Sequence, residues 1–132
     1  MSLSDLHSEL YETAHNAREN ASAIYSNFKV GAALRTKSGK IYFGSNIESS
    51  SFGLSICAER VALFTALSNG EREFDTIFIL SNSEIPASPC GACRQLLYDY
   101  APELNVIMSN LKKEIVIDNI KNLLKNPFSL SS

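Results

Sequence analysis

All three cysteines of this 132-residue chain fall into two short motifs. Cys57 begins a Cys-Ala-Glu motif, and Cys90 and Cys93 lie in a Pro-Cys-Gly-Ala-Cys motif, so no cysteine is left over for a disulfide. Three thiolates can hold a zinc ion and leave its fourth tetrahedral position open, as in catalytic rather than structural sites. The chain must therefore fold so that two distant segments meet at one point.

The residues around these motifs predict two helices. The first begins near Ile56 and ends at Asn69, where Gly70 supplies the left-handed residue that follows many helices. The second runs to about residue 100, with Ser88 as its N-cap and Pro89 at its first helical position.

These two helices would place all three sulfurs near helix N-termini. Cys57 is expected in the first turn of one helix, and Cys90 and Cys93 in the first turn of the other. Positions three residues apart share a helix face, so Cys90 and Cys93 can reach one metal together. The positive partial charge of a helix N-terminus favours thiolate over thiol. Two converging N-termini would thus form a cage of anionic ligands.

The rest of the chain predicts one domain over residues 1–132 with strands and helices alternating. Apolar periodicity predicts an amphipathic helix over residues 4–22, and a last helix follows a cap at Asp118. Strands are expected at residues 29–35, 41–47, 76–80, 106–108 and 114–117. Alternating elements of this kind favour an α/β fold with helix–sheet–helix layers. The last two strands are too close in sequence for a crossover helix, so they should be antiparallel.

Composition excludes several classes of partner. The net charge is −2 and the basic residues are scattered, so no basic stripe is available for a nucleic acid. No apolar run approaches the roughly 20 residues that a membrane span requires. Unpaired cysteines in these motifs fit a reducing compartment, and we expect a cytoplasmic protein.

Glu59 and Arg60 follow the first cysteine and suit metal-assisted hydrolysis. Zinc lowers the pKa of its bound water to about 7, and a carboxylate beside it can take the water's proton and pass it on. Arg60 can hydrogen-bond thiolate sulfurs and offset part of the negative charge of the site. A solvated helix arginine is the alternative interpretation.

At these residues the chain resembles the cytidine deaminase family, specifically the small homotetrameric type that acts on free nucleosides. The resemblance rests on four motifs in the family's order, at residues 25–34, 46–48, 57–60 and 88–95. It implies a three-layer α/β/α sandwich with a five-stranded mixed sheet and one zinc ion per subunit. The implied reaction is hydrolytic deamination of cytidine and 2′-deoxycytidine, with ammonia release, in pyrimidine salvage. The implied homotetramer shares active sites between subunits.

The resemblance also implies roles for the residues around the metal. Cys57, Cys90 and Cys93 would bind zinc, and Glu59 would protonate N3 of the pyrimidine and then the departing amine. The backbone N–H of Ala58 would meet the ring oxygen O2. The carbonyl of Ser88 would meet the leaving amino group.

Further residues would contact the rest of the nucleoside. By resemblance, Asn46 and Glu48 would hydrogen-bond the ribose 3′-hydroxyl, and Phe28 would stack on the base. Without the resemblance, the sequence favours interpreting Phe28 as an aromatic residue of the core, and Asn46 and Glu48 as ordinary polar residues of a loop. The family's C-terminal phenylalanine reaches a neighbouring subunit's site. Phe128 is expected there, with Leu130 as the alternative.

Two positions depart from the family pattern. Ile24 stands where proline is common, and Phe52 stands where tyrosine often contacts the nucleoside. Rival functions are deamination of polynucleotides, guanine or an aminoacyl-nucleoside antibiotic, and a non-catalytic zinc or redox module. The expected antiparallel last strands argue against polynucleotide editors. The Asn46–Glu48 pair with Phe28 argues against the antibiotic-directed relatives, and a redox pair would leave Cys57 unexplained.

Overall fold

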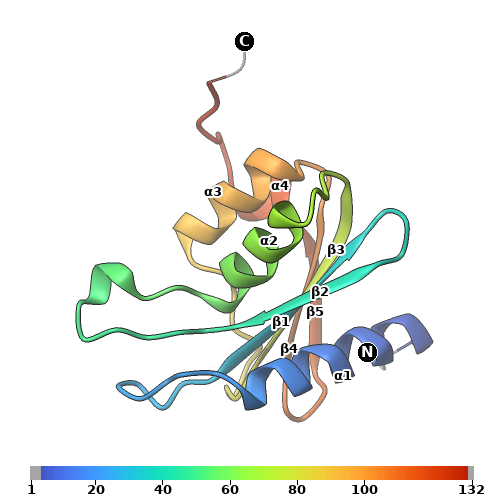
Figure 1. Ribbon diagram of the computed structural model, residues 1–132. Coiled ribbons are helices and arrows are strands. Elements are labelled where there is room, and N and C mark those ends of the chain that lie inside the picture. The colour runs from blue at the N-terminus through green and yellow to red at the C-terminus, as the bar shows by residue number, and fades with distance from the viewer. Residues whose placement is uncertain (1–3, 131–132) are drawn as a thin grey trace.

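The computed structural model describes residues 4–130, which form one sheet with helices on both of its faces (Figure 1). None of the helices in this range is long and apolar enough to cross a lipid bilayer. The elements are α1 (Asp5–Glu19), β1 (Val30–Thr36), β2 (Ile41–Ser45), α2 (Ala58–Ser68), β3 (Phe74–Ser81), α3 (Gly91–Tyr100), β4 (Asn105–Asn110), β5 (Ile115–Asn119) and α4 (Ile120–Leu123).

The five strands are ordered β2-β1-β3-β4-β5 in a mixed sheet. Only the central pair β3–β4 is parallel, and α3 makes the crossover between these two strands. The pairs β1–β2, β1–β3 and β4–β5 are antiparallel. The mixed sheet and the antiparallel last strands are confirmed, as is the three-layer α/β/α fold.

The central strand β3 is buried on both faces, which explains its run of four apolar residues at positions 77–80. Ile77 and Ile79 belong to the core beneath α2, α3 and α4. Phe78 and Leu80 point the other way, into the core beneath α1. Figure 1 shows α1 alone on one side of the sheet, with the other helices opposite. The alternation of side chains along one strand therefore builds both helix layers.

Helix α2 approaches β2 closely enough to require a glycine. A Cβ atom at Gly44 would lie 2.5 Å from the backbone nitrogen of Ala62 and 2.8 Å from the carbonyl oxygen of Ala58. Backbone atoms cannot move aside as a flexible side chain can, so a larger residue here would displace the start of α2. This contact helps to set the position of the first cysteine motif.

Three helix boundaries differ from those predicted. The first helix ends at Glu19, several residues early. The third begins at Gly91 with Cys90 as its N-cap, so the predicted Ser88 cap and the helical position of Pro89 are wrong. Cys90 takes the cap because its sulfur accepts a hydrogen bond from the Cys93 N–H at 3.5 Å.

The last helix also starts later than expected. Asn119, not Asp118, is its N-cap, and the Asn119 side chain accepts from the Lys121 N–H at 3.0 Å. Asp118 instead accepts from the Asn119 N–H and from the Asn122 side chain. Asp118 and Asn119 have similar preferences for the capping position. Because the pairing of β5 with β4 extends through Asn119, the helix starts only after that residue.

Candidate metal centre

The three cysteine sulfurs converge in one cluster, as the spacing of the motifs predicts. Their Sγ atoms all lie within 4.8 Å of one another. Cys90 Sγ is 3.9 Å from Cys57 Sγ and 3.3 Å from Cys93 Sγ. Tetrahedral ligands at the usual Zn–S distance would be about 3.8 Å apart. The sulfurs therefore fit one zinc ion with three protein ligands, and a donor set made only of thiols suits zinc.

Two of the cysteines cap the helices on which the motifs lie. Cys57 is the N-cap of α2 and Cys90 is the N-cap of α3, so each precedes the first turn in which it was expected. Cys93 is buried within the first turn of α3. The unpaired N–H groups of both helices thus point toward the sulfur cluster and favour negative charge there.

The sulfurs differ in their preference for the anionic form. Hydrogen bonding from the Cys93 thiol lowers the pKa of Cys57 to about 5, and bonds from Arg60 and Cys90 act in the same direction. As the donor in the first of these bonds, Cys93 has its pKa raised well above the ordinary range. Cys57 is therefore the sulfur that most readily carries the negative charge that a metal requires.

Arg60 is the cation beside the sulfur cluster. Its Nη2 donates to Cys57 Sγ at 3.5 Å, and this bond raises the pKa of the guanidinium. Its Nε is buried and has no hydrogen-bond partner among the described residues. The side chain is only partly exposed, so the solvated-arginine interpretation does not describe its position.

Glu59 is almost completely buried next to the sulfurs, with 5% of its surface exposed. Burial raises the pKa of its carboxyl group to about 7, partly offset by hydrogen bonding to its own backbone. A carboxyl group with a pKa near neutrality can both accept and release a proton under ordinary conditions. The buried carboxyl and the three sulfurs form the arrangement of metal-assisted hydrolysis.

A cavity of about 210 Å³ opens over this cluster. Four of the residues assigned to substrate by resemblance line it, namely Phe28, Asn46, Ala58 and Ser88, together with Glu59 and two of the cysteines, Cys57 and Cys90. Phe28 is 41% exposed, so it is not a core aromatic. Val30, Ile79 and Ala87 complete the wall. Nothing in the sequence distinguished these three apolar residues from ordinary core positions.

Backbone bridging brings the second motif beside the first cysteine. Ile47 and Ile56 exchange two backbone hydrogen bonds, at 2.9 and 2.8 Å, and so close the intervening loop. Asn46 lies just before this bridge and Cys57 just after it. The bridge therefore brings two residues that line the cavity, Asn46 and Cys57, next to one bridged pair.

Asn46 and Glu48 both shape the loop that carries Phe28. Asn46 accepts from the Val30 N–H at 2.9 Å and donates to the Phe28 carbonyl at 2.8 Å. The Glu48 carboxylate accepts from the N–H groups of Tyr25 and Ser26, each at 3.0 Å, and from the Ser26 hydroxyl. These bonds are formed by residues that are far apart in the sequence.

Glu48 does not line the cavity over the sulfurs. It lies in a neighbouring hollow, which Tyr25, Ser26 and Phe52 also line. Hydrogen bonding from Ser26 lowers the pKa of Glu48. The structure thus brings Phe28, Asn46 and Ser88 to the metal cavity and places Glu48 beside it.

Arg94 holds the segment that enters α3, a role that sequence reasoning missed. Its Nε donates to the Pro89 carbonyl at 2.8 Å, its Nη1 to the Leu123 carbonyl at 2.7 Å and its Nη2 to the Ser88 hydroxyl at 2.5 Å. Its position in the fourth motif was the only signal in the sequence.

Phe128 does not reach the metal cavity of its own chain. It is 68% exposed and lines a separate hollow with Tyr98, Pro102 and Leu130. The side chain of Gln95 donates to the Phe128 carbonyl at 3.0 Å. The tail that carries Phe128 extends away from the body of the molecule in Figure 1.

The fold and the sulfur cluster define an α/β protein with a catalytic type of zinc centre. The family model for the zinc-binding region of cytidine and deoxycytidylate deaminases matches residues 4–109. This chain therefore belongs to the cytidine and deoxycytidylate deaminase family, and its cofactor is one zinc ion, which the cluster of three cysteines is able to hold.

Individual relatives agree with the family model. A cytidine deaminase of Sporosarcina psychrophila is 42% identical over 122 residues, covering 92% of this chain and 90% of the relative. A blasticidin-S deaminase of Bacillus cereus is 36% identical over 123 residues, covering 86% and 87%. The crystal structure of cytidine deaminase from Burkholderia pseudomallei has a TM-score of 0.90 and 46% identity, covering 92% and 98%.

Proposed function

We propose that this chain is a zinc-dependent hydrolase that converts cytidine and 2′-deoxycytidine to uridine and 2′-deoxyuridine. Water replaces the exocyclic amino group, which leaves as ammonia, so the general role is pyrimidine salvage. The observation that carries the proposal is a cluster of three sulfurs, two of which line one cavity together with a buried carboxyl group. The similarity to cytidine deaminases along nearly the whole chain supports the choice of substrate.

Glu59 is the proposed proton carrier. When bound by the sulfurs, zinc supplies the Lewis-acid activation of water that this reaction requires. The Glu59 carboxylate takes a proton from the attacking water and delivers it to N3 of the ring. It then takes the proton of the hydroxyl group that has been added to the ring and passes it to the departing amine, which leaves as ammonia. Its pKa of about 7 suits both directions of transfer. Its burial keeps bulk water from competing for the proton.

The neighbouring backbone orients the pyrimidine. Ala58 is the first residue of α2, so its N–H is unpaired within the helix and is available to the ring oxygen O2. The Ser88 carbonyl is proposed to accept from the amino group of the substrate. Phe28, which lines the same cavity, is proposed to offer an aromatic face to the base.

Asn46 and Glu48 are proposed to bind the ribose 3′-hydroxyl. The hydrogen bonds found among the described residues use two of the four sites of the Asn46 amide and three of about four on the Glu48 carboxylate. Each side chain thus retains capacity for one substrate contact while it shapes the Phe28 loop.

A homotetramer with shared sites is proposed as the working assembly, in the cytoplasm, where the thiols stay reduced. Phe128 is mostly exposed and remote from its own metal cavity, which is consistent with a contribution to another subunit's site. Phe52 and Leu54 are 82% and 69% exposed. Exposed apolar side chains that gather into a patch mark protein–protein contacts, and these two residues are close neighbours in the chain.

Solution mass and a matched pair of variants test the assembly. Light scattering should give four times the 14.5 kDa of one chain. Phe128→Ala should raise the KM for cytidine, whereas Leu130→Ala, which truncates a neighbour in the same tail, should leave it unchanged. A fully active monomer would refute the shared site.

A substrate panel tests the reaction itself. Zinc-loaded protein is incubated with cytidine, 2′-deoxycytidine, cytosine, adenosine, guanine and blasticidin S, and ammonia release is measured. We expect release from the first two compounds. Release from blasticidin S alone would favour the antibiotic-directed reaction. Reversible thiol oxidation without bound zinc, and no release from any compound, would favour a redox module.

A further inference from the structure

Asn110 is a fully buried polar residue, at the end of β4 and away from the metal cavity. Its amide oxygen accepts from the N–H groups of Lys112 and Glu114, both at 3.1 Å. Its amide nitrogen donates to the Glu84 carbonyl at 3.0 Å and to the Glu114 carboxylate at 2.7 Å. These four bonds use the full capacity of the amide group.

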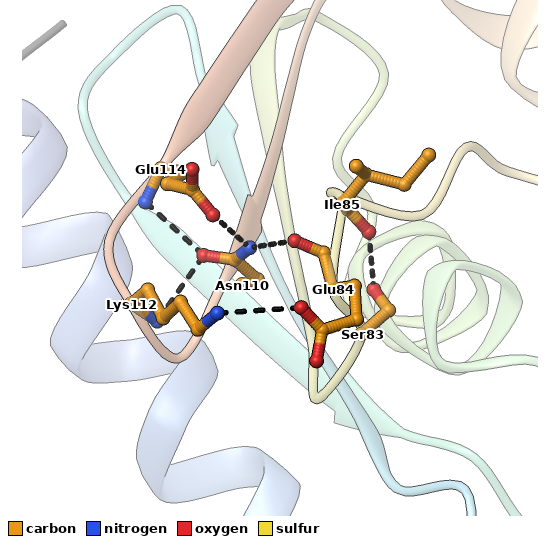
Figure 2. Close-up of polar contacts among 6 residues, drawn as sticks. All are labelled: Ser83, Glu84, Ile85, Asn110, Lys112 and Glu114. Atoms are coloured by element: carbon orange, nitrogen blue, oxygen red, sulfur yellow. Dashed lines mark hydrogen bonds and ion pairs between the residues drawn. The ribbon is translucent and has the colours of Figure 1, made fainter.

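The amide oxygen bonds only the turn between β4 and β5, whereas the amide nitrogen bonds both this turn, at Glu114, and a second segment, at Glu84, as Figure 2 shows. The oxygen holds the turn between β4 and β5. The nitrogen crosses to Glu84, in the segment after β3 that we name the β3–α3 loop (residues 82–90). The two backbone N–H groups require the oxygen at their end, so the nitrogen must face Glu84.

The β3–α3 loop contributes directly to the metal cavity. Ala87 and Ser88 line the cavity, and Cys90 ends the loop as a metal ligand and helix cap. The ladder between β3 and β4 stops at the pair formed by Ser81 and Asn110. Beyond this pair, side chains rather than strand pairing connect the loop to the β4–β5 hairpin.

Two such connections reach Glu84, and they differ in burial. The Asn110 bond to the Glu84 carbonyl comes from a side chain with no exposed surface. The ion pair between Lys112 and the Glu84 carboxylate, at 3.3 Å, joins side chains that are 66% and 92% exposed. Exposed ion pairs contribute little, whereas a buried hydrogen bond to a backbone carbonyl restrains the chain path.

We propose that Asn110 is a positioning residue for deamination, because its bond to the Glu84 carbonyl sets the path of the β3–α3 loop and so places Ser88 in the cavity wall. Arg94 holds the helix end of the same loop through Ser88 and Pro89. The loop is thus fixed at both ends. This inference rests on the proposed function, since it assumes that the cavity receives the substrate.

The Asn110→Asp variant removes the hydrogen bond to the Glu84 carbonyl and keeps the bonds that the Asn110 oxygen accepts from the turn. Aspartate still accepts from the two backbone N–H groups but cannot donate to the Glu84 carbonyl at neutral pH. With cytidine as substrate, we expect kcat/KM per bound zinc to fall about tenfold, the equivalent of one hydrogen bond. A KM raised at least about threefold should accompany the fall, since poorer folding alone would reduce active sites without changing KM.

Two further variants serve as controls. Lys112→Ala removes the exposed link to the same residue and should leave kcat/KM unchanged. Asn110→Asp combined with Glu114→Gln replaces a repulsive pair of carboxylates by a hydrogen-bonded pair. The double variant should regain thermal stability that the single variant loses, and yet retain the raised KM, because the loop bond is still missing.

Each outcome decides the inference. A KM that recovers together with stability in the double variant would show a purely structural role and overturn it. Wild-type kinetics in Asn110→Asp would do the same, as would failure of both Asn110 variants to fold. If the wild-type protein releases no ammonia from cytidine, the proposed function is refuted. If the wild-type protein is active and the Asn110 variants have the same kinetics, the proposed function stands and only the inference about Asn110 is refuted.

Discussion

Replacing Glu59 by glutamine removes the proposed proton carrier while preserving the volume of the side chain. Glu59 is the only carboxyl or imidazole group among the described residues that line the cavity. No neighbouring group can therefore take over the two proton transfers that the reaction requires. Glutamine also leaves the three sulfurs in place, so the variant should bind one zinc ion per chain.

The expected loss follows from general acid–base catalysis, which contributes about 10²- to 10⁴-fold for a positioned group. We expect kcat for cytidine to fall at least about 10²-fold, the equivalent of about 2.7 kcal/mol in the activation free energy. KM should change little, because the ring and sugar contacts assigned to Phe28, Ala58 and Asn46 remain.

Steady-state ammonia release, zinc analysis and a thermal melt on the same preparation provide the test. Glu48→Gln is the matched control, since it neutralises a carboxylate outside the metal cavity and should act mainly on KM. A Glu59→Gln protein that keeps more than about a tenth of wild-type kcat, with zinc bound, would remove Glu59 from its role.

Three further predictions concern the metal and the loop that carries Phe28. Cys90→Ala should lose zinc and melt at lower temperature because the metal joins the starts of α2 and α3; elemental analysis and melting check this, and an unchanged melting temperature would contradict it. Arg60→Gln should weaken zinc binding about 10-fold or more in a chelator competition, since Arg60 donates to Cys57; equal affinity would leave Arg60 without that role. Glu48, whose pKa is lowered in the folded state, stabilises the fold above its ordinary pKa, and this contribution disappears as pH falls through the lowered value. In denaturant unfolding, the difference in the free energy of unfolding between wild type and Glu48→Gln should therefore shrink as the pH is lowered. A difference that grows on acidification would refute the expected pH dependence.

The metal ligands were predictable because their chemistry is explicit in the sequence. Three cysteines with a carboxylate two residues after the first leave few alternatives to a catalytic zinc site. The strand expected at residues 76–80 is likewise confirmed, because an apolar, β-branched run of this length is typical of a strand within a sheet. Local sequence patterns were therefore enough to predict these features, because each depends on a residue type with one dominant physical role.

Helix starts were less predictable because several residues compete for each cap. Ser88 and Pro89 favour a helix start by local preference, but Cys90 takes the cap through its own hydrogen bond to Cys93. The same competition moved the last cap from Asp118 to Asn119. Local preferences differ by about 1 kcal/mol or less among capping residues, so tertiary contacts decide between neighbours.

The sequence by itself indicated the three cysteines that form the cluster, the carboxyl group beside them that is the proposed proton carrier, and the succession of strands and helices along the chain, since these depend on residue type and short-range periodicity. Only the tertiary structure decided that Glu48 lines a hollow other than the metal cavity, that Phe128 lines a further separate hollow, and that Asn110 connects a hairpin to the β3–α3 loop. Such relations join residues far apart in the chain, and their energies depend on burial and geometry that exist only once the chain has folded.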